Sequence, residues 1–333
     1  MNWFYRLLST KRLRRLVEMR QVEIINRSTI ETRLFGLLER TILLFCLSHE
    51  EAKKYPKITI IIEPYVQKQT SSFSGSGWVV PEELTLGRAI IHLNSDSLSR
   101  SNQKTIAQHL PGTLAHELIH ATQELKFNNI TKLEKSKKKL IDALQKADEL
   151  FLLRLFDKYP DGYKELLRIL IQVRTRFRYF FFNLSLEGPA QLAGEMKKGN
   201  VRFTPEQLLA YRKRAEDLTL RIAVYWRDIQ EEFDNDNNLE KIKNTWRKLS
   251  DLLESSTYDV GEYIAFLLLY RDYQVNDFED ILKFAPLKFI KEYVAVETSL
   301  SQNPVVSVTG NVGYVNYNEV LTGWSKIIAK IKK

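Results

Sequence analysis

Two histidines four positions apart, with a glutamate directly after the first, stand in the segment of residues 112–123: His116, Glu117 and His120. The surrounding letters, GTLAHELIHATQ, have the apolar spacing of a helix. Residues four apart on a helix lie on one face, with about 5–6 Å between their Cβ atoms. Both imidazoles can therefore reach one metal ion, beside the carboxylate of Glu117. The alternative interpretation is an ordinary helix that carries two surface histidines.

A catalytic zinc ion needs a third protein ligand, with the fourth position left to water. The chain has five histidines, and none of them follows His120. Its one cysteine, Cys46, excludes an internal disulfide and a cysteine-based metal cluster. The third ligand is therefore expected to be a carboxylate. Two histidines and a carboxylate also suit iron, so zinc is the preferred but not the only metal for this donor set.

Glu187 is the best candidate for that carboxylate. Its neighbours Gly188 and Ala190 are small, which allows this segment to approach the histidine helix closely. Glu187 follows His120 by 67 positions, which is enough for a helical hairpin that returns the chain to the metal. Glu195 is the second choice, and either glutamate can also be an ordinary exposed or paired side chain.

The His-Glu-x-x-His pattern and the Glu-Gly-x-Ala segment together resemble the gluzincins, zinc peptidases typified by thermolysin and the thermolysin-like aminopeptidases. The resemblance covers roughly residues 30–195 and implies His116, His120 and Glu187 as zinc ligands. It also implies that Glu117 is the general base, which takes a proton from the water and passes it to the leaving amine. Gln191 stands where these enzymes have an acid that orients a ligand histidine.

The resemblance also suggests an oxyanion donor and a mode of substrate binding. Tyr258, in the segment YDVG, is similar to the tyrosine of gluzincin aminopeptidases that stabilises the tetrahedral intermediate; Tyr263 is the alternative. The Gly-x-Met-Glu-Asn segment of those aminopeptidases is missing, which favours an endopeptidase. Residues 89–94 are expected to form an edge strand that pairs with a peptide or protein substrate. His92 lies on that strand, either facing the cleft or in a structural role.

The fold class predicted from the whole chain is α+β and mostly helical, because 333 residues include only 13 glycines and 9 prolines. We expect a zincin-like core made of a helix at 30–48, strands at 57–62, 78–80 and 88–94, and a motif helix that starts near Thr113. The sequence further predicts helices at about 134–157, 161–182, 205–232, 238–254 and 258–272, then a hairpin of 305–308 with 312–315.

These elements suggest four regions: a basic amphipathic segment (1–27), the zincin-like α/β half (28–128), a helical subdomain with the third ligand (129–300), and a C-terminal hairpin with a basic tail (301–333). Residues 1–20 can contact a membrane surface or dock on the main domain. Neither a signal peptide nor a transmembrane helix is evident, so a cytoplasmic location is expected.

Two other functions fit the sequence. One is a latent or inactive zincin that serves as a binding module. The other is a basic helical protein that uses its net charge of +9 on nucleic acid or lipid, with the histidine motif accidental. No zinc finger, phosphate-binding loop or aromatic RNA-binding signature accompanies the charge, so no nucleic acid is expected as a partner.

Overall fold

The computed structural model forms two compact units. The first consists of residues 1–130 and 190–202, and the second of residues 131–189 and 203–333. The structure describes residues 22–65, 76–85, 87–135, 160–234, 239–271, 278–300, 302–308 and 312–332, together with residues 9, 10, 13, 138, 153 and 155–157. Most of the expected N-terminal amphipathic segment (1–27), most of the expected helix 134–157 and the turn at 309–311 lie outside these residues. The last part of the N-terminal segment is a strand, β1 Val22–Asn26, and not part of an amphipathic helix.

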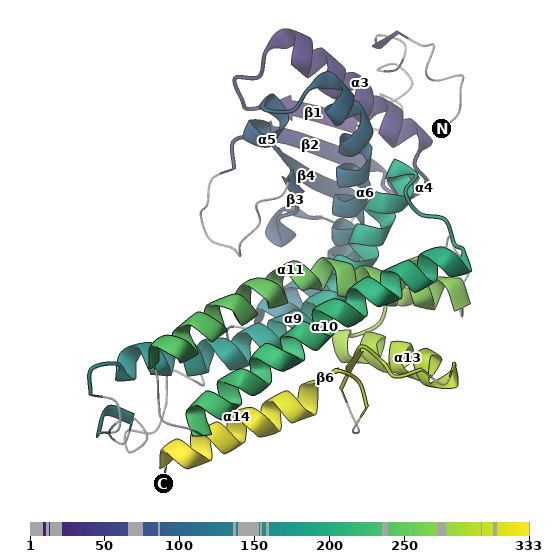
Figure 1. Cartoon of the computed structure of the whole chain (residues 1–333). Helices are drawn as coiled ribbons and strands as arrows, with labels where there is room; N and C mark the ends of the chain where they lie inside the picture. Colours follow the sequence, from purple (N-terminus) through teal and green to yellow (C-terminus); the bar gives the residue numbers. More distant parts are fainter. Residues whose placement is uncertain are drawn as a thin grey trace. The chain divides into compact units, whose positions relative to one another are not determined.

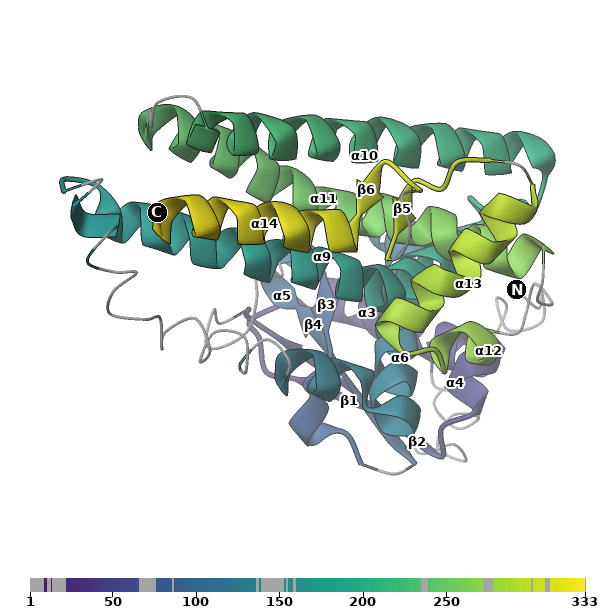
Figure 2. The same ribbon diagram turned by 90° about the horizontal axis from the view of Figure 1, so that it is seen from below.

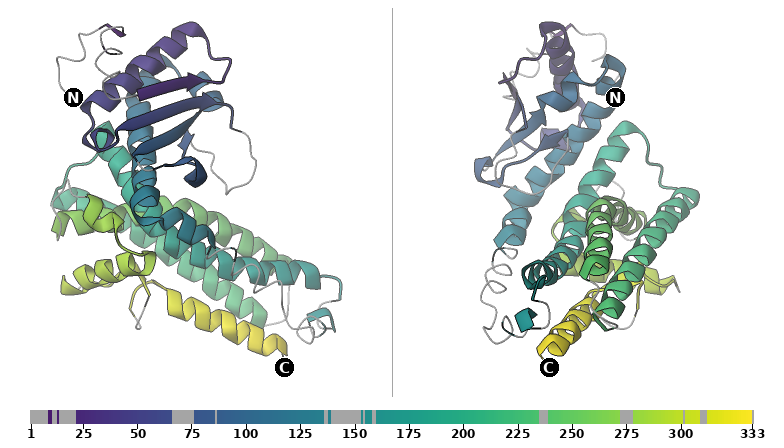
Figure 3. Two further views of the ribbon diagram at one scale, coloured as in Figure 1. Left: turned by 180° about the vertical axis from the view of Figure 1, so that it is seen from behind. Right: turned by 60° about the vertical axis from the view of Figure 1, so that its left-hand side comes forward.

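The first unit is a four-stranded sheet with helices (Figures 1 and 3). Its elements are β1 Val22–Asn26, α3 Thr32–Ser48, α4 Glu50–Lys53, β2 Lys57–Glu63, β3 Gly77–Trp78, the short 3₁₀ helix η1 Pro81–Glu83, β4 Arg88–Asn94, α5 Ser95–Ser99 and α6 Gln103–Phe127. The strand order is β1-β2-β4-β3; β1, β2 and β4 are parallel, and β3 is antiparallel to β4.

The core of this unit lies between one face of the sheet and helices α3 and α6. Because side chains alternate along a strand, β2 presents Ile58, Ile60 and Ile62 to this core. From β4, the side chains at 89, 91 and 93 join them, and α6 contributes Leu114 and Leu118. His92 therefore points to the opposite face of the sheet.

Strand β4 corrects one expectation from the sequence. We expected residues 89–94 to form the edge of the sheet, but β4 pairs with β2 on one side and with β3 on the other. The short strand β3 is the edge next to β4, and β1, which the sequence did not suggest, is the opposite edge. The hydrophobic periodicity of a strand does not show which strands pair with it. Here the pairings of β4 with β2 and β3 place it inside the sheet.

Helix α6 is longer than expected at its N-terminus. It begins after Asn102, whose side chain accepts a hydrogen bond from the backbone N–H of Thr105, and it passes through Pro111 without a break. Proline removes one backbone donor, but the buried Pro111 packs in the core of the first unit. The helix ends at Asn128, which has a left-handed conformation with φ of 53°.

The second unit consists of packed helices with a small two-stranded sheet (Figures 1 and 2). Its elements are α9 Tyr163–Lys198, α10 Pro205–Asp234, α11 Leu239–Arg271, α12 Phe278–Leu282, α13 Pro286–Ser299, β5 Val306–Ser307, β6 Val315–Asn316 and α14 Tyr317–Lys332. Residues 190–198 of α9 belong to the first unit, so one helix is common to both.

Three predictions for this unit are corrected. The helices expected at 238–254 and 258–272 are one helix, α11. The strands expected as a hairpin, β5 and β6, pair in parallel through Val306 and Val315. The expected basic tail forms helix α14, which lies along α9 in Figure 2 and donates a hydrogen bond from Trp324 Nε1 to Leu170 O at 3.0 Å.

The coarse prediction of a mostly helical α+β chain is confirmed: the structure is largely helical and has a small mixed sheet. Among the described residues, no helix combines the length and the apolar character that crossing a bilayer requires.

Candidate metal centre

Helix α6 brings the two motif histidines together. Nε2 of His116 lies 3.1 Å from Nε2 of His120, and the two rings are in an edge-on arrangement with centroids 4.7 Å apart. In a tetrahedral zinc site with Zn–N bonds of about 2.0–2.1 Å, two nitrogen ligands are about 3.3 Å apart. The two ring nitrogens are therefore placed as two ligands of one ion would be.

Glu187 completes a group of three possible ligands. One atom each from His116, His120 and Glu187 lies within 4.8 Å of the others. His120 and Glu187 are buried and His116 is half-buried. A ligand set of two imidazoles and one carboxylate leaves one tetrahedral position open for water or substrate, so the chemistry of these donors fits a catalytic zinc ion.

Two glycines explain how α9 reaches the histidine helix. Inside the first unit, a Cβ on Gly112 would lie only 2.9 Å from Gly194 O, and a Cβ on Gly194 would lie 3.7 Å from Cβ of His116. At this crossing the backbones of α6 and α9 are so close that a side chain larger than hydrogen does not fit at Gly112 without a shift. Glu187 precedes Gly194 by seven residues, two helical turns, and so lies on the same face of α9.

The amide that contacts a candidate ligand histidine is not the one expected from the sequence. Oε1 of Gln123 lies 2.9 Å from Nδ1 of His120, and Gln123 is fully buried. This contact fixes the ring so that Nε2 faces His116, as outer-shell partners of metal-bound histidines do. Gln191, which the resemblance suggested for such a role, is instead 3.5 Å from Glu195. Gln123 was not predicted from the sequence, although it stands one helical turn after His120.

Glu195, the second choice for the third ligand, is engaged elsewhere. Its carboxylate accepts hydrogen bonds from Lys198 Nζ at 2.6 Å and from Asn200 Nδ2 at 2.7 Å. Burial acts to raise the pKa of this carboxyl, but the hydrogen bonds from Lys198 and Asn200 outweigh burial and leave the pKa below its usual value. Glu195 is not one of the three grouped ligands.

Glu117 is buried and faces the edge strand. A Cβ on Gly77 of β3 would lie 3.1 Å from Cγ of Glu117 and 3.1 Å from the Thr113 methyl group. Since β3 has glycine at this position, the strand approaches the side chain of Glu117 directly. A bulkier residue at 77 would push either the strand or the glutamate aside.

Tyr258 and Tyr263 lie on helix α11 of the second unit. In that unit the backbones of Gly261 and Gly188 are in direct contact, and Tyr258 precedes Gly261 by one helical turn. Tyr263, the alternative oxyanion donor, is fully buried and donates its hydroxyl to Glu297, so its hydroxyl is committed to a buried partner. Of the two tyrosines, Tyr258 remains the candidate.

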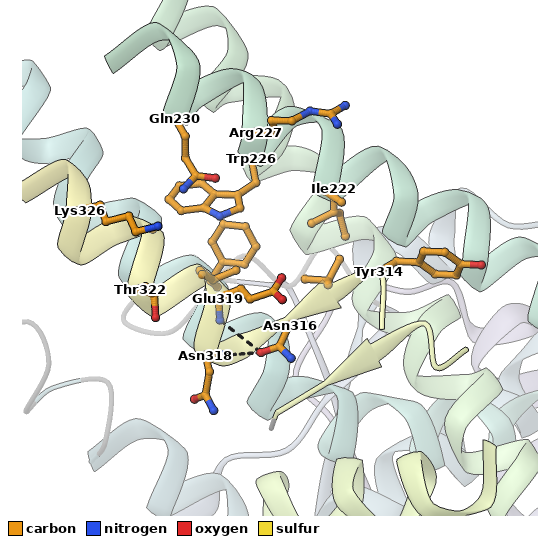
Figure 4. A pocket seen from close by; sticks show the side chains of 15 residues that line it. Ile222, Trp226, Arg227, Gln230, Tyr314, Asn316, Asn318, Glu319, Thr322 and Lys326 are labelled. Atoms are coloured by element: carbon orange, nitrogen blue, oxygen red, sulfur yellow. Dashed lines mark hydrogen bonds between the residues drawn. The ribbon is translucent and has the colours of Figure 1, made fainter. Parts of the chain in front are cut away.

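The second unit also has a pocket of about 620 Å³ between α10, β6 and α14 (Figure 4). Trp226 and Ile222 of α10 form one wall, and Glu319 and Lys326 of α14 lie opposite. None of the predicted site residues lines this pocket.

Comparisons with known proteins give no match: no family model, curated protein or solved structure is similar enough to this chain to be counted. The function is therefore inferred from the residues and their geometry.

Proposed function

We propose that this chain is a zinc-dependent metallopeptidase of the gluzincin type. The missing N-terminus-binding segment favours an endopeptidase. The observation that carries the proposal is the convergence of His116, His120 and Glu187 within 4.8 Å of one another. Two of these residues come from the five-residue motif of α6, and the third, Glu187, stands beside the small residues Gly188 and Ala190 of α9.

Each residue has a defined part in this proposal. The two imidazoles and the Glu187 carboxylate would hold zinc, which supplies a Lewis acid and an activated water. Glu117 would accept a proton from that water and transfer it to the leaving amine. Tyr258 is proposed to donate a hydrogen bond to the developing oxyanion. The buried Gln123 keeps Nε2 of His120 directed at the metal.

Metal content and peptide hydrolysis test the proposal together. The purified chain should contain one zinc ion per molecule and cleave casein or a peptide library. The variant Glu117→Gln should keep its zinc and lose turnover by a factor of about 10² or more, because the general base is gone. Full activity of this variant would refute the mechanism.

The third ligand is tested by a matched pair of glutamates on the same helix. Glu187→Gln should lose bound zinc, since a neutral amide is a poor substitute for a carboxylate ligand. Glu195→Gln is the control and should retain zinc, because Glu195 is held by Lys198 and Asn200. Equal zinc content in both variants, or iron in place of zinc in the native chain, would contradict the proposed centre.

A further inference from the structure

His92 is held between two carboxylates on the sheet face opposite α6. Its Nδ1 lies 2.7 Å from Glu63 Oε1, and its Nε2 lies 2.8 Å from Glu83 Oε2. The residue is only 3% exposed. Ionised carboxylates accept hydrogen bonds and cannot donate them, so both ring nitrogens must donate for both contacts to be hydrogen bonds. Only the protonated imidazolium can do this.

The groups around the ring come from several elements. Glu63 ends β2 and also pairs with Arg27 at 3.4 Å, while Glu83 lies in η1. The Trp78 ring of β3 stacks on the imidazole, with centroids 5.1 Å apart and planes 16° from parallel. Tyr65 contacts the edge of the Trp78 ring. On the other side of β3, Gly77 faces the acidic side chain of Glu117 of α6.

Strand β3 connects this cluster to the candidate centre within the first unit. It has two residues: Trp78 pairs with His92, and Gly77 pairs with Leu93. Because neighbouring side chains on a strand point to opposite faces, Trp78 covers the imidazole while Gly77 lies against Glu117. A strand of two residues has few ladder hydrogen bonds, so its side-chain contacts must help to hold it.

We propose that His92, Glu63 and Glu83 form a proton-dependent clamp that holds edge strand β3 against Glu117. His92 is thus a positioning residue, and the catalytic consequence, though not the clamp itself, rests on the proposed function. A neutral imidazole donates only one hydrogen bond, so its other nitrogen would face a carboxylate without a proton between them. The clamp is therefore complete only while both ring nitrogens of His92 carry a proton.

The protonation state of His92 is the first test. In ¹⁵N NMR spectra recorded between about pH 5 and about pH 8, where an ordinary histidine titrates, both His92 ring nitrogens should carry protons at the acidic end. A single neutral tautomer over this whole range would overturn the proposal, whatever the chain does to peptides.

A substitution that replaces the second acceptor is the sharper test. In Glu83→Gln, the amide can donate to Nε2 of a neutral ring, so the clamp should survive deprotonation. The protection factors of segment 76–80, which correct hydrogen exchange for the intrinsic rise of its rate with pH, should fall about tenfold at alkaline pH in the native chain, the effect of losing one hydrogen bond. In Glu83→Gln the protection of segment 76–80 should change much less over the same pH range. Glu82→Gln, at the exposed neighbouring position in η1, is the control and should behave as the native chain.

Activity separates this proposal from the proposed function. If the chain is a peptidase, kcat should fall at alkaline pH together with the loss of protection, and Glu83→Gln should largely remove that fall with KM unchanged. Identical exchange and pH profiles in the native chain and Glu83→Gln would refute the clamp while leaving the metallopeptidase intact. Absence of hydrolysis would refute the proposed function and leave the NMR and exchange results to decide on the clamp.

Discussion

Replacing Gly188 by alanine should separate helices α9 and α11 next to the proposed ligand Glu187. A Cβ at position 188 would lie 2.2 Å from Gly261 O, 2.3 Å from its carbonyl carbon and 2.7 Å from its Cα. Ordinary van der Waals contact begins at 3.4 Å. The two backbones would therefore have to move apart by about 1.2 Å at this crossing, because main-chain atoms cannot rotate out of the way.

The cost of this movement can be bounded. Overpacking a core costs about 1–3 kcal/mol, and a clash with main chain belongs at the upper end. Alanine in place of glycine inside a helix returns about 1 kcal/mol. The net loss in the free energy of unfolding should be about 2 kcal/mol, which lowers the Tm of a unit of this size by about 4–8 °C. The shift also displaces Glu187, so zinc binding should weaken by about 10- to 100-fold.

Thermal unfolding and competition with a chromogenic chelator measure these two effects. Gly36→Ala is the matched control, because Gly36 lies inside helix α3 and a Cβ there meets nothing within 4 Å. That variant should be as stable as the native chain or up to about 1 kcal/mol more stable, with zinc binding unchanged. If Gly188→Ala kept the native Tm and zinc affinity, the close crossing of α9 and α11 would be wrong.

Three further predictions address the site and its surroundings. Gln123→Leu should weaken zinc binding by about 10- to 100-fold in the same competition assay, whereas Gln123→Glu should retain it, because the His120 ring loses or keeps its acceptor; equal affinities would contradict this role. Tyr258→Phe should lower kcat by about 10²- to 10³-fold at unchanged zinc content, and a native rate would remove Tyr258 from the mechanism. Burial and the nearby Lys197 ammonium lower the pKa of His49 from 6.5 to about 3. Between these values the unfolded chain binds a proton that the folded chain does not, so the free energy of unfolding should fall as the pH drops from 6.5 toward 3. Urea titrations should show a smaller fall in His49→Gln, and an equal fall would refute the assignment.

The features that depend on local spacing could be predicted from the sequence. The four-residue interval between His116 and His120 places both side chains on one face of any helix, and this is what α6 shows. The small residues beside Glu187 were expected to approach the histidine helix, but Gly188 packs against Gly261 of α11, and the close contact with α6 is made by Gly194 instead. The β-branched run of β2 was recognisable as a buried strand.

Features that depend on long-range partners could not be predicted. Strand β1 itself, and the position of β4 between two neighbouring strands, follow from strand pairings that leave no local pattern in the sequence. Parallel pairing of β5 with β6 contradicts the hairpin that a short glycine-containing turn favours. The uninterrupted course of α6 through Pro111 depends on tertiary packing, which outweighs the local penalty of proline.

Contacts between side chains that only the fold brings together could not be predicted from the sequence either. Nothing in the sequence distinguishes Gln123 from the other glutamines, and its role follows only from its contact with His120. The place of His92 between Glu63 and Glu83 requires the ends of β2 and η1 to meet at one ring.

A crystal structure with anomalous-scattering data on both sides of the zinc absorption edge tests the central claim most directly. The proposal predicts one zinc peak about 2.0–2.2 Å from a ring nitrogen of His116, a ring nitrogen of His120 and a carboxylate oxygen of Glu187. A zinc peak bound through Glu195, or no peak between the two histidines of a chain purified with zinc present, would contradict it.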